Sequence, residues 1–203
     1  MLTRFHIESY RGPALERGDS YVYLAPHPLL RPYIPCYTLP CPVNSGMAED
    51  YTILPTASTT VVFSLGENRI DANLRVVNTV ASVVGGHALH YEMLLLIEFH
   101  PGALSPFIQH SPGAFTDISA ALENLDRALR EKIEEAIVSA DSVGGFIRRL
   151  DEVLLRSLQW PERNPQFLEA MTYIRSSRGV MNVSQLSLEV HYSERTLRRL
   201  FRE

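Results

Sequence analysis

The sequence predicts an α+β protein in three parts: an antiparallel β-barrel over residues 1–115, a helical connector over 116–160 and a pair of short helices within 166–203. Runs rich in Val, Ile, Tyr, Phe and Thr fill the first part, which is typical of strands. Apolar residues at helical spacing mark the second. Eleven of the 13 prolines precede residue 113, and the remaining two bracket the linker-like stretch "PERNP" before the third part. At 203 residues and 45% hydrophobic, the chain is large enough for one or two domains with a real core.

Five segments of the first part predict strands, because each is bounded by Gly, Pro, Asn or Asp. They are SYVYL (20–24), YTILPT (51–56), TTVVFSLG (59–66), LRVVNTVASVVGG (74–86) and YEMLLLIEFH (91–100). No helical pattern separates them, so we expect an antiparallel sheet that closes into a barrel. A barrel of this size often encloses a cavity for one small ligand.

The second part predicts two helices separated by "DSVGG". In the first, apolar residues recur at steps of three and four along a stripe of Leu122, Leu125, Leu129, Ile133 and Ala136. In the second, one face carries Phe146, Leu150, Val153, Leu154 and Leu158. The stripe suits either a seam between two chains or packing on the protein's own sheet.

The net charge of −4 is unevenly distributed. From Met171 onward there are six arginines and three glutamates, whereas the preceding residues carry a net charge of −7. A small basic segment on an acidic body indicates that the segment meets a polyanion. The alternative is an arginine-decorated, solvated helix face.

The end of the chain, NVSQLSLEVHYSERTLRRLFRE (182–203), predicts two short helices joined by a tight turn. Ser184 is expected to cap the first helix and Ser193 the second, where Glu194 can pair with Arg198. The expected inner side consists of Leu186, Val190, Leu197, Leu200 and Phe201. The other side of the second helix carries Arg195, Arg198, Arg199 and Arg202. A helix-turn-helix that binds DNA has this arrangement, with apolar residues on the inner side of its second helix and guanidinium groups on the outer side.

These residues resemble the first helix-turn-helix of AraC/XylS-type transcription regulators. The match rests on Ser193, Arg195, Leu197 and Arg199, together with Phe201 as the expected core anchor of the recognition helix. Two residues depart from the family pattern. Ser187 replaces the usual Ala of the tight helix crossing. His191 replaces the usual Gly of the turn, and the resemblance implies that it adopts a left-handed backbone conformation at a cost of about 1 kcal/mol.

The resemblance extends through the chain. APHPLLRPYIPCYT (25–38), YTILPTASTTVVFSLG (51–66) and IEFHPGAL (97–104) are similar to segments of one AraC-type sensor subgroup. It implies a cupin-like sensor domain that binds a small apolar or aromatic effector, and a homodimer. The expected lining residues are Tyr37, Tyr51, Leu54, Phe63, His87, Tyr91 and Phe99.

The family has two helix-turn-helix units, and this chain matches only the first. We therefore expect a transcription regulator that binds DNA weakly and mainly through phosphates. One alternative is an interaction module that dimerises with a full-length relative.

The other alternative is a metal-dependent, cupin-like enzyme. Its ligands would come from His87, His90, Glu92, Glu98 and His100. Cupin metal sites use a His-x-His spacing, whereas here the spacing is His-x-x-His, which places the two histidines on opposite faces of a strand. We therefore expect no metal, no cofactor and no enzymatic activity. The sequence also has no hydrolase, P-loop or dinucleotide signature.

The expected cellular location also rests on features that the sequence lacks. No uninterrupted apolar run reaches the length of a membrane span, and no signal peptide is visible. Cys36 and Cys41 make no disulfide framework. The expectation is a cytoplasmic protein with reduced thiols and no membrane partner.

Overall fold

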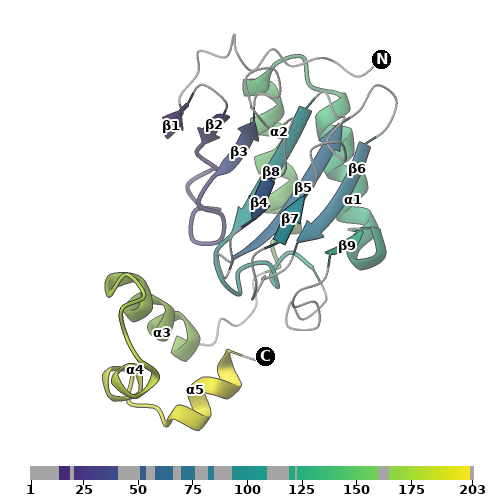
Figure 1. The fold of residues 1–203 in the computed structure, drawn as a ribbon. Helices are drawn as coiled ribbons and strands as arrows, with labels where there is room; N and C mark the ends of the chain where they lie inside the picture. The colour runs from purple at the N-terminus through teal and green to yellow at the C-terminus, as the bar shows by residue number, and fades with distance from the viewer. Residues whose placement is uncertain are drawn as a thin grey trace. The chain divides into compact units, whose positions relative to one another are not determined.

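The computed structural model describes residues 14–18, 21–40, 51–53, 58–65, 70–75, 82–84, 93–108, 119–121, 123–159 and 165–201. The chain divides into two compact units, Met1–Gln159 and Trp160–Glu203 (Figure 1). The first unit holds the strands and two helices. The second holds three helices. None of the described helices is long and apolar enough to cross a membrane.

Antiparallel strands dominate the first unit. They are β1 (Glu16–Arg17), β2 (Tyr21–Leu24), β3 (Tyr37–Pro40), β4 (Tyr51–Ile53), β5 (Thr59–Leu65), β6 (Ile70–Arg75), β7 (Ser82–Val84), β8 (Met93–Phe99) and β9 (Ser119–Ala121). Seven of them form one sheet in the order β1-β2-β3-β8-β5-β6-β9, while β4 pairs with β7 separately. All the pairs are antiparallel, as expected from the sequence.

The sheet is open rather than closed. The two ends of its strand order are β1 and β9, and no pairing among the described strands joins them. The expected barrel is therefore corrected to an open antiparallel sheet in the part of the chain described. The physical reason is that each edge strand is short, with two and three residues, so neither offers the ladder that closure requires.

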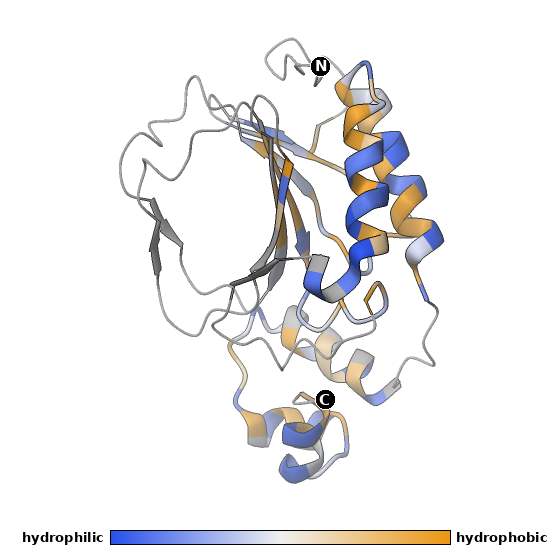
Figure 2. Cartoon of the chain, turned by 90° about the vertical axis from the view of Figure 1, so that its right-hand side faces the viewer, coloured by the Kyte–Doolittle hydropathy of each residue, from blue (hydrophilic) through white to orange (hydrophobic). Residues whose placement is uncertain are grey.

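One face of the sheet is covered by helices α1 (Glu123–Val138) and α2 (Val143–Ser157), as Figure 2 shows. Alternate residues of the central strands supply this face: Val61 lies opposite Ile97, and Phe63 lies opposite Leu95. All four are buried. The helices add Leu129, Ile133, Phe146, Leu150 and Leu154 to the same core. Burial of one strand face against helices is thus what holds the unit together.

The expected apolar stripe on the first connector helix packs within the chain. Leu129, Ile133 and Ala136 are buried, the first two in the core shared with the sheet. Leu122 and the side chain of Leu125 lie outside the described residues. Of the two interpretations of the stripe, packing on the protein's own sheet holds for these three residues, so they are not available as a seam between chains.

Local signals at the helix starts differ from expectation. The helix α1 contains a non-helical residue, Asp126, whose carboxylate accepts a hydrogen bond from the Leu129 amide at 2.8 Å. Ser142 caps α2 by accepting from the Gly145 amide, so the glycines of "DSVGG" lie in the first turn of α2 rather than breaking the helix. The break between the helices is therefore at 139–142.

A partly buried hydrogen bond ties the sheet to α2. The Tyr37 hydroxyl on β3 donates to Asp151 Oδ1 at 2.8 Å, and the His27 amide donates to the same oxygen at 3.0 Å. Burial raises the pKa of the Asp151 carboxyl, and the two hydrogen bonds oppose that increase. Burial likewise raises the pKa of Tyr37 well above its usual value. The carboxylate thus holds a strand, a loop and a helix together.

The second unit is a small three-helix bundle. It contains α3 (Pro165–Ser176), α4 (Val183–Glu189) and α5 (Glu194–Leu200). Its core is formed by Ala170, Leu186, Val190 and Leu197. The chain turns after α3 at Gly179, which has a φ of +76° and whose amide donates to the Ile174 carbonyl at 2.9 Å. Two short helices therefore pack on α3 through a shared apolar core.

Tyr37→Phe keeps the buried ring but removes the donor to Asp151. Because hydrogen bonds to charged groups are worth about 1.5–3 kcal/mol, we expect the free energy of unfolding to fall by roughly that amount in urea titrations. The control Asp151→Asn keeps an acceptor oxygen and removes the desolvated charge, so it should cost less. Equal stability of Tyr37→Phe and the unmodified protein would show that the bond contributes nothing.

Candidate functional site

Three of the seven expected lining residues lie in the main core instead. Tyr37, Phe63 and Phe99 are fully buried on the helix-covered face of the sheet. Their side chains pack in the core that α1 and α2 share with the sheet, and their role as ligand contacts stays a prediction. Tyr51 begins β4, and its side chain lies outside the part of the chain that the structure describes. The other three, Leu54, His87 and Tyr91, lie outside the described residues.

The opposite face of the sheet has a different character, which the sequence reasoning missed. Along β8, Leu96 and Glu98 are half-buried, while their neighbours Leu95, Ile97 and Phe99 are buried. Strand register places Leu96 beside Thr38 on one side and Val62 on the other; Thr60 lies opposite Glu98. This set of five, Thr38, Thr60, Val62, Leu96 and Glu98, is named the polar face. The sequence pattern that could have predicted the polar face is the alternation of residues in "TTVVFSL" and "LLLIEF". This alternation puts one carboxylate among apolar and hydroxyl side chains.

Glu98 is the one acidic residue among the five residues of the polar face. Burial raises its pKa above the usual value of 4.5, and a hydrogen bond with Thr38 opposes that shift. The neighbouring thiol of Cys36 has a raised pKa, mainly from burial and then from the charge of Glu98. Thr38 also lies 4.0 Å from the Cys36 sulfur. The cluster therefore places a partly desolvated carboxyl beside a thiol whose raised pKa disfavours the reactive thiolate.

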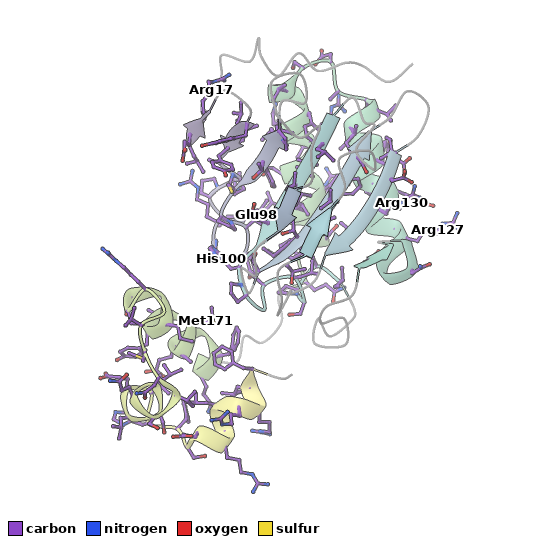
Figure 3. The ribbon with its side chains drawn as sticks, viewed as in Figure 1. Arg17, Glu98, His100, Arg127, Arg130 and Met171 are labelled. Carbon is purple, nitrogen blue, oxygen red and sulfur yellow. The ribbon has the colours of Figure 1, made fainter. Side chains whose placement is uncertain are left out.

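The alternative metal site is described only in part. Glu98 and His100 lie on and just after β8, and both are labelled in Figure 3. The other three candidate ligands, His87, His90 and Glu92, lie outside the described residues. Within the described ranges, no three His, Cys, Asp or Glu side chains are grouped to hold a metal ion. The enzyme alternative accordingly stays untested.

The caps of the last two helices were expected in part. Ser193 caps α5 and accepts from the Thr196 amide at 3.2 Å, which confirms the expectation. The cap of α4 is Asn182 rather than Ser184: its side chain accepts from the Gln185 amide at 2.8 Å, and the Gln185 side chain accepts from the Asn182 amide at 3.0 Å. This reciprocal pair satisfies two amides at once, so it outcompetes a single serine.

Two serines instead connect α4 with α5 and the turn. Ser184 donates to Glu194 Oε1 at 2.5 Å. Ser187, which stands at the expected tight crossing, donates to the Tyr192 carbonyl. A hydroxyl therefore binds the backbone of the turn at this position.

The arginines of α5 lie on the side of the helix away from its apolar residues. Leu197 is 1% exposed and Leu200 is buried, whereas Arg195, Arg198 and Arg199 are exposed. The expected pair is present: Arg198 Nη2 lies 3.7 Å from Glu194 Oε2. Both partners are largely solvated, so the pair adds little stability and mainly orients Arg198 along the helix. Arg202 lies outside the described residues.

Phe201 is not the core anchor that the sequence suggested. It follows the last residue of α5, remains 44% exposed, and its ring centroid lies 5.1 Å from that of Phe167 on α3. The inner side is otherwise as expected, since Leu186, Val190, Leu197 and Leu200 are buried. Position explains the difference: the chain leaves the helix at Phe201, so this side chain packs on an edge rather than between helices.

The turn between α4 and α5 has the expected left-handed residue. His191 has a φ of +55° and is exposed. A side chain in this region costs about 1 kcal/mol relative to glycine. The turn therefore retains a strained, solvent-facing histidine.

Comparison with known proteins gives one match. Residues 23–120 match a family described as a domain of unknown function, DUF6597. Neither a curated protein nor a solved structure matches the chain. The matched stretch runs from within β2 to within β9, and so includes most of the sheet and the polar face.

Glu98→Gln should make stability less dependent on pH. The pKa of Glu98 is higher in the folded protein than its usual value, so the folded state binds the proton more tightly. Stability should fall as pH rises from about 4.5 through the folded pKa. The variant lacks this loss of stability. Its melting temperature should therefore exceed that of the unmodified protein at neutral pH and equal it below a pH of about 4. A gap that widens toward acid pH would refute this assignment.

His191→Gly should stabilise the second unit by about 1 kcal/mol, because glycine adopts a positive φ without steric cost. The control is His191→Ala, which removes the imidazole but keeps a Cβ and should give no gain. Urea titrations followed by circular dichroism would compare the two. If alanine stabilised as much as glycine, the imidazole rather than the backbone would be the source of strain.

Proposed function

We propose that the chain is an AraC-type transcription regulator, in which the second unit contacts DNA and the first unit senses a small molecule. The observation that carries the proposal is the geometry of α4 and α5. Two capped helices meet at a tight turn, and the second presents three exposed arginines opposite a buried leucine seam. This is the arrangement by which a recognition helix enters a DNA groove.

Charge supports the same proposal. Arg195 and Arg199 are four residues apart on an exposed helix surface, and guanidinium groups bind guanine edges and phosphates with paired donors. Glu194 lies at the first turn of α5, where its charge favours the helix dipole. It also pairs with Arg198. In this proposal Arg195 and Arg199 are the side chains that enter a groove.

The sensing role is assigned to the first unit because of its sheet. The sheet buries one face against its own helices, and on the other face it carries the polar face, with the half-buried Glu98. We further propose that two chains pair to bind DNA. The described residues of the α1 stripe are already buried, so pairing would use another surface.

Binding to duplex DNA should depend on α5. The full chain, titrated into a fluorescent random-sequence duplex, should bind weakly and lose affinity steeply as salt rises. Arg195→Ala and Arg199→Ala should each weaken binding and lower the slope of log affinity against log salt by about 1.

The matched control is Arg149→Ala, which removes an exposed arginine of α2 in the other unit. Its affinity and salt slope should equal those of the unmodified chain. Equal losses for all three variants would indicate a general effect of net charge. No loss for the α5 variants would remove this helix from the interface.

A further inference from the structure

We propose that the polar face binds a small organic amine, with the ammonium group on Glu98 and an apolar body over Leu96 and Val62. The inference rests on the sensing half of the proposed function and names the class of molecule sensed. It replaces the expectation of a purely apolar or aromatic effector.

The first step of the argument is the position of Glu98. It lies near the end of β8, in the middle of the seven-stranded sheet, with Thr60 directly opposite on β5. On the other side, the Tyr37–Ile97 register brings Cys36 beside it. A central strand is an expensive place for a half-buried carboxylate, because its charge is partly removed from water.

The second step concerns the described partners of Glu98. The described ion pairs of α1 and α5 join arginines and glutamates within one helix, and none of these pairs includes Glu98. Its one described hydrogen-bond partner is Thr38. An ionised carboxylate accepts about four hydrogen bonds, so Glu98 can accept from further donors besides Thr38. Burial raises the pKa of this group, because removal from water disfavours the charged carboxylate.

The third step concerns the surroundings. Leu96 and Val62 face each other across β8 and β5 on the same side of the sheet, and both are half-buried. Thr38 and Thr60 supply hydroxyl groups on either side of Glu98. A ligand with one cationic donor group and a compact hydrocarbon body fits this surface. The cationic group binds the carboxylate, and the hydrocarbon packs on the two apolar side chains. A carboxylate ligand would meet the repulsion of Glu98.

The probes are benzylamine, benzyl alcohol and benzoate, which share one ring and differ in charge. Benzylamine has eight non-hydrogen atoms. At a typical binding free energy of about −0.3 kcal/mol per atom, we expect a dissociation constant of about 10 mM or lower. In calorimetric titration of the full chain, benzylamine should bind, benzyl alcohol should bind at least about tenfold more weakly, and benzoate should not bind. Benzylamine binding that is absent, or no tighter than that of benzyl alcohol or benzoate, would overturn the proposal.

Variants then assign the binding to Glu98. Glu98→Gln should weaken benzylamine binding at least about tenfold, whereas Glu135→Gln, the same change on the exposed surface of α1, should leave it unchanged. Thr60→Lys provides a second readout if Glu98→Gln does not fold, because a lysine opposite Glu98 should occupy the carboxylate and also abolish binding. Unchanged affinity in either polar-face variant would refute the site.

The outcome is separable from the DNA-binding proposal. The titrations contain no DNA, so a failure of amine binding leaves the role of α5 intact. Conversely, amine binding by a chain that fails to contact DNA would preserve the site and refute the regulator.

Discussion

One-sided burial of the antiparallel sheet is the constraint on which the first unit depends. In β5 and β8 every second side chain enters the core with α1 and α2. Of the described side chains between them, Thr60, Val62, Leu96 and Glu98 are half-buried and Leu94 is buried. Side chains such as Phe63 and Phe99 are each worth about 1.5–3 kcal/mol when fully buried. A slip of one residue in the register would exchange the two faces, so the pairing is strongly specified. The location of Glu98 follows directly from that pairing.

The second unit solves a similar problem on a smaller scale. It has few core residues, and Leu197 joins α5 to α3 and α4 through the cluster of Ala170, Leu186 and Val190. Once Leu197 and Leu200 point inward, the helical period forces Arg195 and Arg199 outward. The exposed cationic surface is therefore a consequence of the core rather than a separate feature. The caps fix where the helix begins, and so which residues make up that surface.

Much of this arrangement could be predicted from the sequence, and the exceptions have physical causes. Strands at 59–65 and 93–99, the two helices of the middle segment and the cap at Ser193 follow from local patterns. The role of Phe63 and Phe99 does not, because alternation identifies two faces without saying which one the helices will cover. The strand at 119–121 was mistaken for helix because its pairing with β6 is a long-range contact. Asn182 was missed as a cap because only its reciprocal bonds with Gln185 distinguish it from Ser184.

The most direct test of the account is an NMR titration of the isotope-labelled chain with a random-sequence DNA duplex. The account predicts that amide shifts change in Glu194–Leu200 and in the turn before it, while the strands of the sheet and α2 remain unchanged. Shift changes confined to the sheet unit, with α5 unaffected at saturating DNA, would contradict it.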